Sequence, residues 1–107
     1  NFSTNRITGA NANSQGFYLI NRTSSTVFKV FKNNAQFGLT NTGASTPNVN
    51  TITSKLYISA LNNTGAAVNF SNRELAFASI GDGLTDAEAL AFYNAVQTFN
   101  TTLSRQV

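Results

Sequence analysis

The chain has no Cys and no His, and its 107 residues include a single proline. Without Cys there can be no disulfide framework, thiolate nucleophile or cysteine-ligated metal site. Because His and Cys are the commonest general bases and nucleophiles, their absence removes the usual catalytic arrangements. Long apolar runs are also missing, so the sequence predicts no membrane span.

Charge is scarce as well, at 10% of residues against about 25% in an average soluble domain. The acidic residues are Glu74, Asp82, Asp86 and Glu88. Glycosidases need paired carboxylates, and the start of a helix accounts for Asp86 and Glu88, so we expect no enzyme. The seven cations are spread along the chain without a basic run. Nucleic-acid surfaces cluster cations with stacking aromatics, so we expect no nucleic-acid partner.

Neutral polar and aromatic residues take the place of charge. Asn, Ser and Thr number 16, 10 and 14, and there are nine Phe and three Tyr. Asn, Ser and Thr side chains compete for backbone hydrogen bonds, so they favour turns, caps and β surfaces over helices. With 41% hydrophobic residues the chain can bury a modest core. This composition is typical of one β-rich domain on an extracellular protein or a particle.

Short strands alternate with polar turns over the first 80 residues. Asn33-Asn34 and the turn at 62–65 predict hairpins, because Asn and Gly tolerate positive φ. Loops are predicted at 9–16 and 41–53. The predicted strands are 17–20, 26–32, 35–40, 55–61, 66–70 and 73–80. Strands at this spacing indicate a mainly β, antiparallel, jelly-roll-like sandwich of about six to seven strands.

The C-terminal segment predicts one amphipathic helix. Thr85-Asp86-Ala87-Glu88 is a capping box, in which the Thr85 hydroxyl accepts from the Glu88 amide and the Glu88 carboxylate accepts from the Thr85 amide. The apolar stripe beyond it consists of Ala89, Phe92, Tyr93, Val96, Phe99 and Leu103. A one-sided helix has to bury its stripe, either against the sheet or as a short coiled-coil seam between copies of the chain.

A glycine elbow, Gly81-Asp82-Gly83, separates the last predicted strand from this helix. A phosphate-binding loop would need a further glycine, and Asp86 and Glu88 place negative charge where a phosphate would sit. We therefore interpret the elbow as a joint between strand and helix. Calcium binding is the more serious option, because Asp82 and Asp86 could offer hard oxygen ligands together with backbone carbonyls and Asn side chains, although a turn and a helix cap also explain both residues.

The end of the chain resembles a known family. The segment Asn-Arg-Glu-Leu-Ala-Phe-Ala-Ser-Ile-Gly at 72–81, then Leu-Thr-Asp-Ala-Glu-Ala at 84–89 and Phe92-Tyr93, is similar to the end of concanavalin A-like, laminin-G-type jelly-roll domains. The likeness is to the form found at the ends of phage tail and virion-surface proteins. It implies one such domain over 1–107, or the C-terminal part of one in a longer chain. It also implies recognition of carbohydrate or a cell surface, sometimes with calcium, but no single binding residue carries over.

Aromatic and amide side chains are the candidate ligand-binding groups, because ring faces stack on sugars while amides bind hydroxyl groups. The candidates are Tyr18, Tyr57, Asn62 and Asn63. The Asn-rich loops 9–16, 41–50 and 62–65 would supply further amides. The alternative for each residue is a structural role, with the aromatics in the core and the Asn side chains in turns.

Two functions from different classes stay open. The first is a non-enzymatic, lectin-like module on a virion or secreted protein that recognises a glycan or a host surface. The second is a purely structural module whose strand edges and helix stripe pack on a neighbouring domain, or assemble the chain into a homo-oligomer, fibre or shell. Specific sugar binding by a monomer favours the first, whereas a stable homo-oligomer that binds no glycan favours the second.

Overall fold

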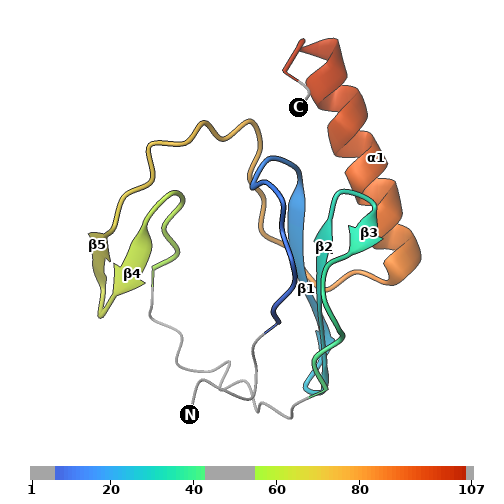
Figure 1. The fold of residues 1–107 in the computed structure, drawn as a ribbon, viewed down its shortest axis with the longest axis horizontal. Helices are drawn as coiled ribbons and strands as arrows, with labels where there is room; N and C mark the ends of the chain where they lie inside the picture. Colours follow the sequence, from blue (N-terminus) through green and yellow to red (C-terminus); the bar gives the residue numbers. More distant parts are fainter. Residues whose placement is uncertain (1–6, 43–54, 106–107) are drawn as a thin grey trace. The chain divides into compact units, whose positions relative to one another are not determined.

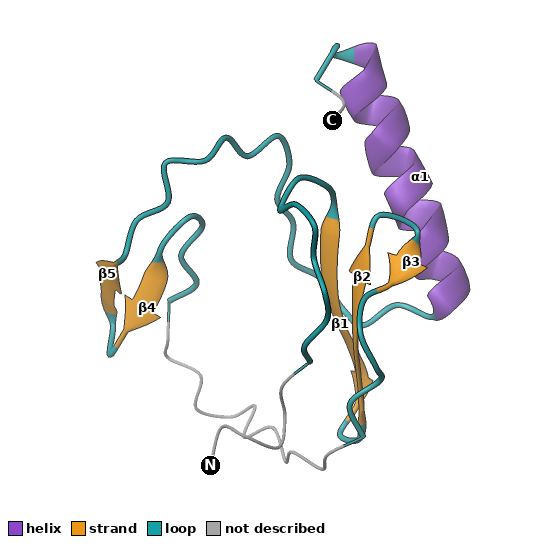
Figure 2. Ribbon diagram, in the orientation of Figure 1, coloured by secondary structure: helices purple, strands orange, loops and turns teal. Residues whose placement is uncertain are grey.

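The computed structural model describes residues 7–42 and 55–105. The chain divides into two units, one formed by Asn1–Thr46 with Gly81–Val107 and the other by Pro47–Ile80, and each is described by itself. The described residues contain five strands in two small antiparallel sheets and one C-terminal helix (Figures 1 and 2). This confirms the prediction of small antiparallel sheets followed by a single helix.

The sheet of the first unit has the order β1-β2-β3, with β1 at Tyr18–Ser24, β2 at Val27–Lys32 and β3 at Ala35–Gln36. β1 and β2 pair so that Leu19 lies opposite Phe31. The turn between β2 and β3 is the predicted one, and Asn33 adopts a φ of 56° there, a conformation that Asn tolerates better than most residues.

Helix α1 spans Asp86–Thr102, and Thr85 caps it. The capping box is confirmed. The Thr85 hydroxyl accepts from the Glu88 amide at 3.3 Å, and the Glu88 carboxylate accepts from the Thr85 amide at 2.8 Å. Acidic side chains at this end also suit the helix dipole. No helix in the described part of the chain is long and apolar enough to cross a membrane.

One side of α1 packs on the sheet of the same unit. The Phe17 ring, just before β1, lies 5.8 Å from the Phe92 ring and 5.9 Å from the Tyr93 ring, measured between centroids. Ala89 and Val96 are each 4% exposed and are the buried apolar residues of the described chain. The first part of the stripe therefore packs on the sheet, as in the first of the two arrangements expected for it.

The C-terminal half of the stripe was predicted wrongly. Phe99 and Leu103 are 50% and 46% exposed, whereas Asn100 is buried. The buried side of the helix continues from Val96 to Asn100, whereas the Phe99 ring is half exposed and its centroid lies 5.8 Å from the Arg105 guanidinium. A 3-4 spacing of apolar residues gives the general side of a helix but leaves its rotation on the sheet open by about one residue.

A buried amide fixes the segment that leads into α1. Asn21, in the middle of β1, is 4% exposed. Its Nδ2 donates to the Leu84 carbonyl at 2.6 Å, and its Oδ1 accepts from the Leu84 amide at 2.9 Å. Next to this pair, Gly83 lies so close to β1 that a Cβ atom there would overlap the Arg22 carbonyl. Gly83 is therefore held directly against β1 at the entry to α1, although no strand precedes the elbow as predicted.

The second unit contains one hairpin, with β4 at Leu61–Asn63 and β5 at Ala66–Val68. Thr64 and Gly65 form the turn with φ values of 51° and 95°. Gly65 suits such a turn because glycine has no Cβ to hinder positive φ. The predicted turn at 62–65 is therefore confirmed, although Asn62 and Asn63 belong to the strand.

Two predicted strands are absent. In 55–61 only Leu61 is part of a strand, and Ser59 has a φ of 58°, which interrupts an extended backbone. The segment 73–80 has no strand, although its residues alternate in polarity. Alternation shows which residues could share a face, but a strand also needs a neighbour to receive its hydrogen bonds.

The third predicted strand is shortened. β3 covers only the start of 35–40, because Gly38 adopts a φ of 72° and turns the chain out of the ladder. Asn41 then rejoins β2 through an isolated bridge to Phe28. The rest of the loop predicted at 41–53 lies outside the described residues from 43 onward. Five described strands, rather than six to seven, do not establish a sandwich.

The close approach at Gly83 gives a stability prediction with an internal control. Gly83→Ala should lower the free energy of unfolding by about 1–3 kcal/mol, the usual range for forcing an extra group into a filled space. Nothing lies within 4 Å of a Cβ built on Gly81. Gly81→Ala should therefore leave stability unchanged or raise it slightly. Urea denaturation of both variants measures this, and equal effects would contradict the contact between Gly83 and β1.

Candidate ligand-binding site at Tyr18

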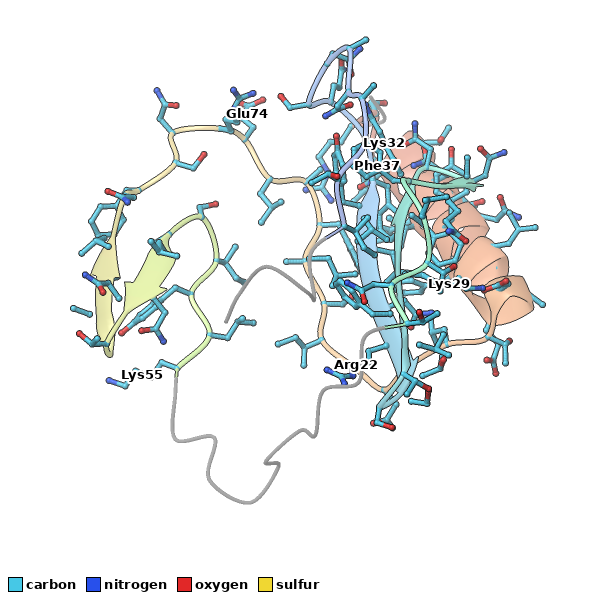
Figure 3. The ribbon with its side chains drawn as sticks, turned by 60° about the horizontal axis from the view of Figure 1, so that its bottom comes forward. Arg22, Lys29, Lys32, Phe37, Lys55 and Glu74 are labelled. Atoms are coloured by element: carbon cyan, nitrogen blue, oxygen red, sulfur yellow. The ribbon has the colours of Figure 1, made fainter. Side chains whose placement is uncertain are left out.

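Tyr18 and Lys32 lie across from each other at one end of the β1–β2 hairpin. Tyr18 is the first residue of β1 and pairs with Lys32, the last residue of β2. The Lys32 Nζ is 5.6 Å from the centroid of the Tyr18 ring, which is within the range of a cation–π contact. Tyr18 is 40% exposed. In Figure 3, Lys32 lies at this end of the sheet and Arg22 at the opposite end.

The polar loop 9–16 wraps around the Lys32 ammonium group. Lys32 Nζ donates to Asn11 Oδ1 at 2.6 Å, to the Asn13 carbonyl at 2.7 Å and to Asn13 Oδ1 at 3.3 Å. Asn11 also donates from Nδ2 to the Tyr18 hydroxyl at 2.9 Å. An ammonium group has three protons, so one lysine organises two Asn side chains beside an exposed ring.

The other end of the loop is fastened to the turn after β2. The Phe17 amide donates to Asn33 Oδ1 at 3.0 Å, and the Asn33 amide donates to the Phe17 carbonyl at 2.8 Å. A Cβ on Gly16 would lie 2.8 Å from Asn33 Oδ1, so the chain passes close to this turn. The loop is therefore anchored at both ends, which holds Asn11 and Asn13 near the Tyr18 ring.

The predicted candidates in the second unit have structural partners. The Tyr57 hydroxyl donates to the Gly65 carbonyl at 2.8 Å. Asn62 accepts from the Gly65 amide at 2.8 Å through Oδ1 and donates to the Lys55 carbonyl through Nδ2. Asn63 is exposed on β4, where it pairs with Ala66. Tyr57 and Asn62 therefore close the hairpin of the second unit.

The two predicted calcium ligands differ in their surroundings. Asp86 accepts from Lys29 Nζ through both carboxylate oxygens, at 2.7 and 2.6 Å. Asp82 is exposed. The described residues include no group of three or more His, Cys, Asp or Glu that could hold a metal ion. A calcium ion at Asp86 would have to compete with the ammonium group of Lys29.

A depression between the sheet and the start of α1 is too small for an organic ligand. Its volume is about 20 Å³, close to the space that one water molecule occupies, whereas ligand pockets measure about 300–1,000 Å³. The lining residues are Phe17, Leu19, Phe31, Asn33, Asn34, Asp86, Ala89 and Leu90. This depression is therefore not a ligand pocket.

Sequence reasoning selected Tyr18 and loop 9–16 but missed Lys32. The signal was present in the hairpin. A turn near Ser24 sets a register that carries the end of β2 back to the start of β1, and Lys32 then lies opposite Tyr18. The loop residues that bind Lys32 could not be predicted from the strand register, because an irregular loop has no register.

Comparison of this chain with protein-family models, with curated proteins and with solved structures gave no significant match. The case for a function therefore depends on the residues described above.

The helix start predicts a dependence of stability on pH. The pKa of Glu88 lies below its ordinary value of 4.5, because the Thr85 amide and then the Thr85 hydroxyl donate to its carboxylate. A lowered pKa in the folded chain adds stability that is complete above 4.5 and is lost as the pH falls from 4.5 through the lowered value. Melting temperatures should therefore decrease over this interval.

Glu88→Gln tests the origin of that decrease, because an amide cannot change charge with pH. The variant should lose part of the acid-induced fall in melting temperature. Thr85→Ala should lose a smaller part, because it removes the hydroxyl donor but keeps the amide donor. A Glu88→Gln variant with the full acid dependence of the original chain would show that other groups cause it.

Proposed function

We propose that this chain is a non-enzymatic recognition module that binds glycans through the surface around Tyr18. The observation that carries the proposal is an aromatic ring, 40% exposed, next to the amides of Asn11 and Asn13 and the ammonium group of Lys32. Aromatic rings bind the apolar faces of sugars, and fixed amides and cations bind their oxygen atoms. A virion surface or a secreted protein is the setting we propose for it.

The placement of the acidic residues supports a role without catalysis. Asp86 is paired with Lys29, and Glu88 is held by the Thr85 amide and hydroxyl. Both carboxylates therefore have a structural use at the start of α1. Glycoside hydrolysis requires two carboxyl groups that flank the scissile bond, and the remaining acids, Glu74 and Asp82, belong to different units of the chain.

For the fold, we propose a jelly-roll-like sandwich of the concanavalin A or laminin-G type. Two features support it. The first unit has an antiparallel sheet covered by α1 on one face, and side chains on its other face include Ile20, which is 73% exposed in the middle of β1. A sandwich would cover the middle of that face with a second sheet, and the proposed glycan site requires that the Tyr18 end of the strands stays open. An experimental structure without a facing sheet would contradict this proposal.

Removing the Tyr18 ring tests the glycan proposal. Tyr18→Ala should weaken binding to any glycan found on an array by about tenfold, or ~1.4 kcal/mol. Tyr18→Phe should retain most of the affinity because the ring remains. Phe70→Ala serves as a control, since Phe70 is an aromatic residue of the second unit that is 77% exposed. Equal affinity of the Tyr18→Ala variant, or an array without any bound glycan, would contradict the proposal.

A purely structural role is the second candidate, and the exposure of Ile20 favours it. Ile20 and Tyr18 lie on the same face of β1, at 73% and 40% exposed, and exposed apolar side chains grouped on one face mark surfaces that a partner covers. A second copy of the chain could supply the cover. Assembly would then be the activity of the module, with or without glycan binding.

Light scattering after size-exclusion chromatography tests this second role. If copies associate through this face, Ile20→Lys should convert an oligomer into a monomer with an unchanged circular dichroism spectrum. Leu39→Lys is the matched control, because Leu39 is 86% exposed in the same unit but lies outside the strands. A wild-type chain that stays monomeric at high concentration would rule out assembly by the chain alone.

A further inference from the structure

We infer that the Tyr18 surface selects acidic sugars, with the Lys32 ammonium group as the partner of a sugar carboxylate. This inference depends on the proposed glycan binding and adds a ligand class to it. The observation behind it is the difference between the two lysines of β2, which lie three residues apart in the sequence and have different kinds of partner.

Lys29 is neutralised within the chain. On the side of the sheet that α1 covers, its Nζ lies 2.6 Å from one oxygen of Asp86 and 2.7 Å from the other. The charges of this pair cancel locally, so the helix side of β2 offers little to an anion. Lys29 therefore contributes to the contact between β2 and α1.

Lys32 has only uncharged partners among the described residues. Its three hydrogen bonds go to the Asn11 side-chain oxygen and to the side-chain and main-chain oxygens of Asn13. The ion pair between Lys29 and Asp86 is the one salt bridge that the structure gives for its described residues. The Lys32 residue is half-buried, and no Asp or Glu of the described chain forms a salt bridge with it.

A charge in this position favours an anionic ligand. The three hydrogen bonds of Lys32 go to neutral oxygens, and a carboxylate that replaces one of these oxygens forms a stronger, charge-assisted bond. The ring of Tyr18 is 5.6 Å away, measured from its centroid to Lys32 Nζ. A sugar ring on Tyr18 with a carboxylate on one of its ring carbons, as in uronic and sialic acids, presents apolar and anionic groups to these two side chains together.

A glycan array with matched acidic and neutral versions of the same oligosaccharides tests this inference. The original chain should bind sialylated or uronate-containing glycans at least tenfold more tightly than the neutral versions, and salt should reduce the difference. Lys32→Gln should remove the preference for the acidic versions but leave binding of neutral glycans within about twofold. Lys55→Gln is the control, because it removes the same charge from an exposed lysine in the second unit.

A second variant is needed because Lys32→Gln also removes the hydrogen bonds that hold loop 9–16. Asn13→Asp has the same shape as the original residue and adds a carboxylate next to Lys32, so it neutralises the charge while retaining the contact. It should also lose the acidic preference, with an unchanged circular dichroism spectrum. Retention of the preference in this folded variant would overturn the role of Lys32.

The outcomes separate the two proposals. Equal binding of acidic and neutral glycans would overturn the selection of acidic sugars and leave glycan recognition in place. Sulfated glycans bound as tightly as carboxylated ones would overturn the assignment to carboxylates. An array with no bound glycan would overturn the proposed function, and the inference with it.

Discussion

The double hydrogen bond between the Asn21 side chain and the Leu84 backbone is the contact on which the arrangement of the first unit depends. It joins residues 63 positions apart in the sequence, and both hydrogen bonds are partly buried. An Asn side chain has the same donor and acceptor as a peptide group, so it can pair with a backbone as a neighbouring strand would. If either group of Leu84 lost its partner, the chain would retain a desolvated polar atom, which is costly.

This contact decides which face of the sheet α1 covers. Leu84 comes immediately before the Thr85 cap, so fixing Leu84 on β1 also fixes the start of α1. The helix then covers the face that carries Leu19, Asn21 and Phe31. The Lys29–Asp86 ion pair links β2 to the start of α1. Because strand residues alternate, Tyr18 and Lys32 are left on the opposite face. The candidate recognition surface follows from the position of the helix.

Features that depend on neighbouring residues could be predicted from the sequence. The capping box at Thr85, the turn at Asn33 and the turn at Gly65 each need only a few adjacent side chains, and all three are present. Features that depend on a distant partner could not. The segment 73–80 alternates like a strand but does not form one, and nothing local in β1 distinguishes Asn21, which is buried, from an Asn in a turn.

At the candidate site, too, local features could be predicted and distant partners could not. Tyr18 was identified from its chemistry, as an aromatic residue beside a polar loop, and the hairpin register then explains Lys32. Tyr57 was selected by the same chemistry, yet its hydroxyl is bound to the Gly65 carbonyl. Residue type alone therefore cannot rank these two tyrosines. What separates them is the partner of each polar group. At Tyr57 the partner is the backbone of its own hairpin, whereas at Tyr18 it is a loop organised by a lysine whose charge no acidic residue in the described chain balances.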